Sequence, residues 1–492
     1  MTTPPEVVSK KPTGPKLVLL SETFHRQSVQ RDQSPTIHCL MTLDSIPKTE
    51  AVTEKIRELI ETYPLFRSTV VEHKTFFRSN YHWFTPTLDS VSSASFVSEV
   101  SLQIQSKPDP VISPDNNNEC DRALKRFVSE KMPEFFDVSK GMFKVYVVRY
   151  LAEGADKQPI TDRCDLVWRI HHGIGDGILL SKCLESLCEK VDSGQERASV
   201  SVKKPRKPIP LYRKIWLGVS AVSKTLMLPL SCPDAGTSLK APSNYKKMGK
   251  AKTYASSKTW KVDSIKAVAK TMDCTLNDVV MACLSGGMRK YLQSVSDPVV
   301  EKKKNLKIRA LAVVNTRTGM EGLLEAFKKC EAPNEFSYVI PFMPLGDMSS
   351  EDRVKACKKE MDRLKSSPEP FVVRKLNNTI RDLMGGKFVL AFNSDFVVNK
   401  FTCFFSNLPG PRGPLKIMGE NLLRMSNFVH PMMYSCGLSI QSYNGELVIN
   451  ASVDKVLVGD ATKLMQFVDE VWEELKGVGD GGEGGAEGDN LI

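Results

Sequence analysis

The sequence predicts an α/β protein, of mixed α+β character, that is built from two lobes. The chain has 492 residues, whereas a single domain usually contains about 100–200 residues. Short apolar segments rich in β-branched and aromatic residues alternate with segments of helical periodicity. A polar, basic stretch with three prolines over residues 193–213 separates two such halves.

In the first half, apolar positions at helical spacing predict a helix that is capped by Thr49 and stops at Pro64. Phe143–Tyr150 is rich in β-branched and aromatic residues and predicts a strand. Leu166–Ile170 predicts a second strand, and helical spacing returns after Gly177.

The second half restarts with a predicted strand at Ala255–Val262, followed by a helix from about residue 264. Asn444-Gly445 is a favoured type I′ turn pair and predicts a hairpin between Gly437–Gln441 and Glu446–Ser452. A last helix is predicted over Leu464–Trp472. Further strands are predicted at Ile308–Val314, Phe388–Phe392 and Phe401–Phe405.

These elements predict five segments along the chain. A flexible N-terminus (1–15) precedes an N-terminal lobe (16–192), and a crossover linker (193–245) leads to a C-terminal lobe (246–476). The Gly- and Glu-rich residues 477–492 predict a disordered acidic tail.

Composition excludes several classes of protein. Hydrophobic residues make up 41% and charged residues 25% of the chain, which argues against wholesale disorder and against a polytopic membrane protein. The twelve cysteines contain no CxxC pair, so we expect reduced thiols and no zinc site. The polar segment Met1–Lys11 has no apolar core of a signal peptide, which indicates an intracellular protein.

The longest apolar run and the positive charge bear on two candidate partners, a membrane surface and a phosphate-bearing cosubstrate. Ile215–Leu230 is shorter than the roughly 20 residues that cross a bilayer, so it is either a core or interface helix or a segment that lies on a membrane surface. The net charge is +11, but no nucleic-acid-binding motif accompanies it. We therefore expect no nucleic-acid partner, and we expect the basic linker at Lys203–Lys207 to favour anionic headgroups or a phosphate-bearing cosubstrate.

The motif HHxxxDG, formed by His171, His172, Asp176 and Gly177, is the main functional signal. Strand alternation puts His172 on the face that Leu166, Trp168 and Ile170 share and turns His171 away, so only one imidazole can serve a given site. A neutral imidazole is well suited to removing a proton from an alcohol near pH 7. Asp176 can orient the loop, and Gly177 permits close packing or a positive φ. The alternative is a satisfied core histidine beside a capping aspartate.

This motif resembles that of the chloramphenicol acetyltransferase-like superfamily of CoA-dependent acyltransferases and peptide-synthetase condensation domains. Four further segments, in the same order along the chain, resemble the wax ester synthase/acyl-CoA:diacylglycerol acyltransferase branch. They are Pro64-Leu65-Phe66, Asn277-Asp278, Asn315-Thr316-Arg317 and Ser406-Asn407. The chain departs from the branch at Lys140-Gly141-Met142-Phe143, where Pro-Leu-Trp is usual, and at Pro333-Asn334, where Gly-Asn is usual.

Each of these segments also has a purely structural interpretation. Pro64-Leu65-Phe66 can end a helix and fill the core, and Ser406-Asn407 can belong to a turn that ends a strand. Thr275 and Asp278 form a helix-capping pattern. Asn277, just inside that helix start, can instead face a reacting thioester.

The resemblance implies two chloramphenicol acetyltransferase-like lobes, each a mixed sheet flanked by helices, with an active-site tunnel between them. It implies acyl-CoA as cosubstrate, with no bound cofactor and no metal. His172 would be the general base, Asp176 would support the loop, and His171 would stand behind it. Asn277 or the amides of Gly173–Gly175 would stabilise the oxyanion.

The acceptor implied by the resemblance is a long-chain fatty alcohol, which gives a wax ester, or diacylglycerol, which gives triacylglycerol. Such an enzyme would work on the endoplasmic reticulum membrane or a lipid droplet, and otherwise in the cytoplasm. One alternative is an acyltransferase with a specialised-metabolite alcohol or amine acceptor, although the DFGWG signature of its plant branch is absent. Another is an acyl-CoA-binding protein without activity. A condensation domain would need neighbouring carrier and adenylation domains, for which the chain has no room.

Overall fold

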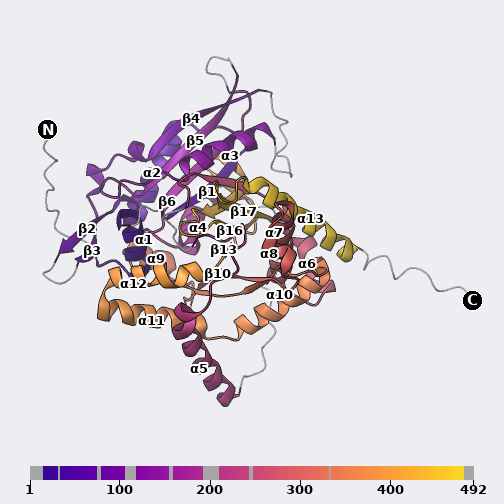
Figure 1. Ribbon diagram of the computed structural model, residues 1–492. Coiled ribbons are helices and arrows are strands. Elements are labelled where there is room, and N and C mark those ends of the chain that lie inside the picture. Colours follow the sequence, from indigo (N-terminus) through magenta and orange to yellow (C-terminus); the bar gives the residue numbers. More distant parts are fainter. Residues whose placement is uncertain are drawn as a thin grey trace, which may run out of the picture.

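The computed structural model describes residues 15–30, 34–74, 79–105, 118–153, 159–191, 210–242, 248–317, 319–331 and 334–480. Two large β-sheets with helices packed on their faces form the body of the molecule (Figure 1). The predicted mixed α/β class with two sheet-based lobes is confirmed. Residues 1–14 of the predicted flexible N-terminus, residues 193–209 and 243–245 of the predicted linker, and residues 481–492 of the predicted tail lie outside the described residues. The basic stretch Lys203–Lys207 is among them.

The first sheet has the strand order β4-β5-β6-β1-β15-β14-β7. Its central pairs β5–β6 and β6–β1 are antiparallel, and β4 runs parallel to β5. The strands are β1 (Thr36–Leu43), β4 (Val97–Ile104), β5 (Phe143–Ala152), β6 (Cys164–His171), β7 (Glu189–Lys190), β14 (Leu415–Ile417) and β15 (Glu420–Val429). A separate hairpin joins β2 (Thr69–Lys74) and β3 (Ser79–Phe84).

Two strands of this first sheet come from the second half of the chain. β15 pairs antiparallel with β1, so that Ile37 lies opposite Val429 and Met41 opposite Met425. Leu422 and Met425 are buried in the same apolar core as Met41. The sequence assigns the contiguous range 246–476 to a C-terminal lobe. Within that range, however, the segment 415–429 belongs to the first sheet.

The second sheet has the order β11-β10-β13-β16-β17-β8, with β12 beside β10 and β9 beside β17. The predicted hairpin is present, because Asn444 and Gly445 both have positive φ between two antiparallel strands. The strands are β8 (Lys252–Ser256), β9 (Trp260–Lys261), β10 (Lys307–Asn315), β11 (Phe336–Val339), β12 (Phe342–Pro344), β13 (Cys403–Leu408), β16 (Cys436–Tyr443) and β17 (Glu446–Asp454).

The helices cover both sheets, and the longest ones pack on the second sheet (Figure 1). On the N-terminal side lie α1 (Leu19–Gln30), α2 (Thr49–Thr62), α3 (Glu119–Lys131), α4 (Gly177–Ser186) and short 3₁₀ turns at Pro64–Arg67, Leu88–Ser90 and Ser93–Phe96. The others are α5 (Leu211–Met227), followed by η4 (Leu228–Leu230), then α6 (Val262–Thr271), α7 (Leu276–Ser294), α8 (Pro298–Lys302), α9 (Leu323–Lys328), α10 (Ser350–Lys365), α11 (Glu369–Met384), α12 (Gly386–Phe392), η6 (Asn393–Val397), η7 (Val398–Lys400) and α13 (Ala461–Asp480).

Four local predictions are wrong. Phe388–Phe392 is the helix α12 and not a strand, because a short apolar run has no periodicity that separates the two. Thr49 is the first helical residue of α2, which Lys48 precedes without a side-chain cap. The single strand expected at Ala255–Val262 is split into β8 and β9, and α6 already starts at Val262. Residues 477–480, which were expected to be disordered, continue α13.

The segment Ile215–Leu230 forms most of α5 and the η4 turn, and it is not a core helix. Figure 1 shows α5 projecting from the body of the molecule at the foot of the view. Its inner side packs on α11, where Ala221 is buried, whereas Trp216, Val219 and Leu226 are exposed by 65%, 65% and 51%. Within the described residues, no helix is both long enough and apolar enough to cross a bilayer.

Candidate active site

A mostly apolar cavity of about 240 Å³ lies where the two sheets meet. α1 and the turn after β6 line one side, and β10, β11, β13 and the α12–η7 segment line the other. Of the residues that the sequence singles out, the lining contains His172, Asp176, Gly177, Asn315, Arg317, Ser406 and Asn407. These come from segments up to 235 positions apart in the chain, between His172 and Asn407, so the fold brings them together.

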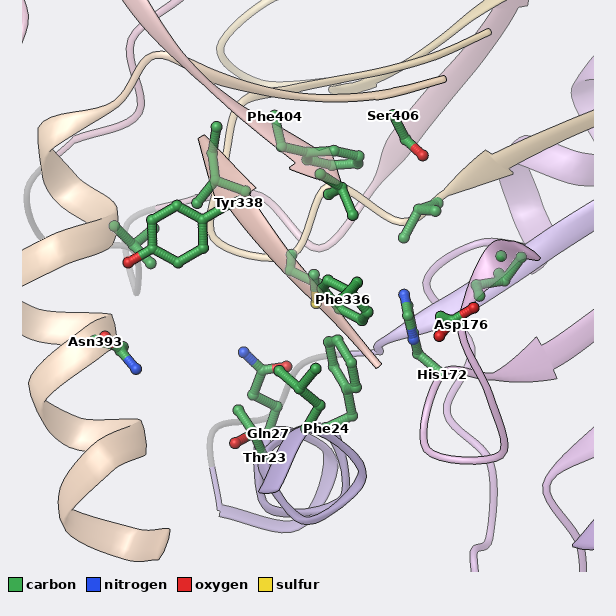
Figure 2. A pocket seen from close by; sticks show the side chains of 18 of the residues that line it. Thr23, Phe24, Gln27, His172, Asp176, Phe336, Tyr338, Asn393, Phe404 and Ser406 are labelled. Atoms are coloured by element: carbon green, nitrogen blue, oxygen red, sulfur yellow. The ribbon is translucent and has the colours of Figure 1, made fainter. Parts of the chain in front are cut away.

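His172 stands at the edge of this cavity, in the turn between β6 and α4 (Figure 2). Its ring stacks on Phe24 of α1 with centroids 4.0 Å apart and lies 5.6 Å from the ring of Phe336. The residue is only 8% exposed. Burial lowers the pKa of His172 to about 4, although its own main-chain carbonyl and the Asp176 carboxylate act in the opposite direction. The imidazole is therefore neutral at pH 7 and able to accept a proton.

The neighbouring His171 does not line the cavity. Its Nδ1 atom accepts a hydrogen bond from the amide of Gly173 at 3.0 Å, and Nε2 lies 2.9 Å from the Ser28 hydroxyl. Because Nδ1 is an acceptor, the ring proton sits on Nε2 and is donated to Ser28. His171 thus braces the turn against α1 in its neutral form, and burial lowers its pKa to about 3.

Asp176 fixes the turn from the other side. Its Oδ1 atom accepts from the amide of Leu179 and caps α4, as anticipated for an aspartate at this position. Its Oδ2 atom accepts from the Arg317 guanidinium at 2.6 Å and from the amide of Glu335 at 2.9 Å. The aspartate and the arginine are both buried, with side chains 6% and 4% exposed. This ion pair ties the turn after β6 to the end of β10 in the second sheet.

Gly177 begins α4 and has no positive φ. A Cβ at this position would lie 2.6 Å from the Leu408 side chain of β13. Of the two roles expected for this glycine, the structure shows close packing.

Asn315 is the last residue of β10, and Arg317 follows it. The side-chain oxygen of Asn315 accepts from the main-chain amide of Arg317 at 3.1 Å. Asn407 lines the cavity from β13 and donates to the side-chain oxygen of Asn277 at 2.8 Å. Asn277 itself is exposed and lies outside the lining, so Asn407 stands between it and the cavity.

The remaining predicted residues serve the core. Asp278 accepts from both the amide and the hydroxyl of Thr275 at 2.8 Å, which is the capping arrangement of α7. Leu65 and Phe66 are fully buried in the core of the first lobe, where Phe66 meets Phe143 edge-on. Pro64 starts the 3₁₀ turn that delivers them. None of these four side chains lines the cavity.

Sequence reasoning missed three groups beside His172. Phe24 stacks on the imidazole, and Phe336 closes its other side. The amide of Asn334 donates to the carbonyl oxygens of His172 and Gly173 and to the Ser21 hydroxyl, at 2.9, 3.3 and 2.9 Å. Pro333-Asn334 is noted above only as a departure from a family pattern, and no periodicity marks Phe24 or Phe336 as facing a cavity.

Known proteins resemble this chain in sequence. Residues 333–476 match the family model described as "WS/DGAT C-terminal domain". Wax ester synthase/diacylglycerol acyltransferase 11 of Arabidopsis thaliana is 24% identical over 396 residues, a match that covers 75% of this chain and 78% of that relative. The chain is thus similar to the wax ester synthase/diacylglycerol acyltransferase family.

Solved structures show that the chain has the fold that its sequence predicts. The wax ester synthase/diacylglycerol acyltransferase from Marinobacter aquaeolei VT8 superposes with a TM-score of 0.60 at 15% identity, covering 95% of this chain and 100% of the other. The starter condensation domain of rhizomide synthetase, solved in complex with C8-CoA, superposes with a TM-score of 0.53 at 9% identity, covering 94% of each chain. The chloramphenicol acetyltransferase-like architecture is therefore confirmed.

In the part of the chain that the structure describes, no group of three His, Cys, Asp or Glu side chains is placed to hold a metal ion. The polar and ionisable groups at the cavity are the His172 ring, the Arg317–Asp176 ion pair and the polar side chains on the cavity side of α1.

Proposed function

We propose that the chain transfers a fatty acyl group from acyl-CoA to the hydroxyl of a lipid alcohol, with His172 as general base. The observation that carries this proposal is the neutral imidazole of His172 at the wall of an otherwise apolar cavity. An apolar cavity suits long hydrocarbon chains. The names of the relatives, which join wax ester and diacylglycerol chemistry, support a fatty alcohol or diacylglycerol as acceptor.

The reaction proceeds within a complex of both substrates. His172 takes the proton of the acceptor hydroxyl, and the alcohol oxygen attacks the thioester carbonyl carbon. The carbon–sulfur bond of the tetrahedral intermediate then breaks, and the imidazolium returns its proton to the departing CoA thiolate. The products are an ester and CoA with a free thiol, and no covalent enzyme intermediate is needed.

The fixed turn gives His172 its position. Asn334 holds the carbonyls of His172 and Gly173, His171 braces Gly173, and Asp176 caps the following helix. The amides of Gly173 and Ile174 are already bonded to His171, which leaves the amide of Gly175 and the side chains around the cavity as oxyanion donors. Asn407, whose side chain lines the cavity, is the candidate that we propose in place of Asn277.

The assay gives the purified protein labelled palmitoyl-CoA with 1-hexadecanol or 1,2-dioleoylglycerol and separates the lipid products. His172→Ala should lower turnover by about 10²–10⁴, the usual contribution of a general base. The matched control is His73→Ala, because His73 is exposed on β2. Formation of neither ester by the unaltered protein would reject the function, and full activity of His172→Ala would reject the base.

We further propose that the protein works on an anionic lipid surface, such as the endoplasmic reticulum membrane or a lipid droplet, through the outer face of α5. Four residues of α5 lie on one side of the helix, because they follow one another at intervals of four, three and seven residues: Tyr212, Trp216, Val219 and Leu226. All four are exposed. Lys224, on the same helix, is exposed and adds the charge that anionic headgroups attract.

Two helices that line the cavity also carry exposed apolar side chains. Phe371 and Leu383 of α11 and Phe388 of α12 are exposed, and the same two helices contribute Asn377 and Val389 to the cavity lining. A lipid acceptor that enters from the surface would therefore meet an apolar path to the site.

Flotation with vesicles of phosphatidylcholine, with and without an anionic phospholipid, tests this contact. Val219→Glu combined with Leu226→Glu should weaken binding at least about tenfold, because each residue loses the burial of an apolar side chain worth about 1.5–3 kcal/mol. Val456→Glu is the control, since Val456 is 71% exposed on a turn that follows β17. If the double variant bound the vesicles as tightly as the unaltered protein, the α5 contact would be rejected.

A further inference from the structure

Arg374 lies on α11 outside the cavity lining, and the acyl-transfer reaction described above does not use it. Its Nη1 atom donates two hydrogen bonds, to the Glu335 carboxylate at 2.7 Å and to the Thr316 hydroxyl at 3.0 Å. Thr316 directly follows β10, and Glu335 directly precedes β11. Because β10 and β11 pair antiparallel, the arginine binds two neighbouring strand ends at once.

These two strand ends hold Asp176. The main-chain amide of Glu335 donates to the Oδ2 atom of Asp176 at 2.9 Å. The guanidinium of Arg317, the residue after Thr316, donates to the same oxygen at 2.6 Å. The Thr316 hydroxyl also donates to the main-chain oxygen of Glu335 at 3.2 Å, so the two ends are bonded to each other. Arg374 therefore bonds to one of the residues that hold Asp176 and to the neighbour of the other.

The residues on either side of Glu335 face the catalytic turn. The Asn334 amide donates to the main-chain oxygen of His172 at 2.9 Å, and the Phe336 ring lies 5.6 Å from the His172 ring. Because successive side chains of an extended chain point to opposite sides, the Glu335 side chain points away from His172 and toward Arg374. The ion pair of Glu335 with Arg374 thus anchors this three-residue segment from the side opposite to the turn.

The ion pair and the turn differ in their sensitivity to a substitution. The Arg374 and Glu335 side chains are 37% and 27% exposed, and partly exposed pairs contribute little to stability. The rate of turnover depends more steeply on position, because a displacement of about 1 Å can cost about 100-fold. We infer that Arg374 is a positioning residue for the general base His172, which it holds in place through Glu335 and Thr316. This inference rests on the proposed function.

The test uses labelled palmitoyl-CoA with the acceptor, 1-hexadecanol or 1,2-dioleoylglycerol, that the unaltered protein esterifies faster. Arg374→Met removes both hydrogen bonds, whereas the ammonium group of Arg374→Lys can restore the ion pair with Glu335. The control is Arg381→Met on the same helix, because the Arg381 guanidinium bonds to the neighbouring Asp382. For each protein, kcat, the KM of both substrates and the melting temperature are measured.

Arg374→Met should lower kcat by about 10–100-fold, since His172 loses part of its support. Both KM values should stay unchanged, because Arg374 does not line the cavity. The melting temperature should fall by no more than about 1 °C, as expected for a partly exposed ion pair. Arg374→Lys should recover most of the lost kcat, and Arg381→Met should change none of these quantities.

Glu335→Gln tests the same contact from its other partner. It removes the charge but keeps the main-chain amide that bonds to Asp176. This variant should also lower kcat. The double variant Arg374→Met with Glu335→Gln should be no slower than Arg374→Met alone, because both substitutions act on one contact.

An unchanged kcat in Arg374→Met, a rise in KM without a fall in kcat, or no recovery in Arg374→Lys would overturn the positioning role. Losses of kcat that simply add in the double variant would also overturn it. Failure of the proposed function looks different, because the unaltered protein would then form no ester or His172→Ala would keep full activity.

Discussion

The ion pair between Asp176 and Arg317 joins the turn that carries His172 to the second sheet, so its removal should affect both stability and turnover. In Asp176→Asn, the amide oxygen can still accept from Leu179 and cap α4. The amide nitrogen, however, would face the Arg317 guanidinium and the Glu335 amide, which are both donors. A buried cation would thus lose its counter-charge.

The magnitude follows from the burial of the pair. Both side chains are nearly inaccessible, and breaking a buried pair by removing one partner costs about 3–5 kcal/mol. For 492 residues, an unfolding entropy of about 2.1 cal/mol/K per residue amounts to about 1 kcal/mol/K. The melting temperature should therefore fall by about 3–5 °C. Turnover should fall more steeply, because small displacements of a catalytic group can cost about 100-fold.

Calorimetry and the palmitoyl-CoA assay measure the two effects. The control is the double variant Asp176→Asn with Arg317→Met, in which no buried charge is left alone. It should be more stable than Asp176→Asn, so that the two substitutions are far from additive. If the double variant lost as much stability as the two single variants together, the pair would not be the source of the effect.

Three further predictions concern stability and the turn. The protein should be acid-labile, because five of its histidines are buried. The pKa values of these histidines in the folded protein lie below 6.5, the value in the unfolded chain, so the unfolded chain binds more protons below about pH 6.5. The free energy of unfolding should therefore be highest above about pH 6.5 and should fall as the pH falls toward 4. Each histidine contributes up to about 1.4 kcal/mol per pH unit to this fall, which amounts to up to about 7 kcal/mol per pH unit for all five. Urea unfolding between pH 7 and 4.5 measures this, and a constant midpoint would contradict it. Gly410→Ala should lower stability by more than about 3 kcal/mol, because its Cβ would lie only 1.9 Å from the main-chain oxygen of Ser442; an unchanged melting temperature would show that this contact relaxes. Asn334→Ala should lower kcat more than it lowers the melting temperature, since it frees the carbonyls of His172 and Gly173, and equal activity would refute its positioning role. The histidines are His25, His38, His171, His172 and His430.

Local sequence signals predicted many of the elements because those signals act over short distances. The β-branched run Phe143–Tyr150 is within β5, and the Asn444-Gly445 pair forms the turn between β16 and β17. Thr275 and Asp278 cap α7 as their spacing indicates. Phe388–Phe392 shows the limit, since its apolar side chains fit a helix or a strand and packing beside α1 and α11 made it a helix.

The sequence by itself located the candidate site, an HHxxxDG motif between a strand and a helix, in a chain whose further segments resemble one acyltransferase family. Only the tertiary structure decided which residues stand around His172. Phe24 reaches it from α1 and Asn334 from the segment before β11, and Arg317 reaches Asp176 across the sheets. Strand β15 likewise joins the first sheet from more than 370 positions beyond β1. Such contacts have no local pattern, because they depend on how two sheets pack and not on the spacing of neighbouring residues.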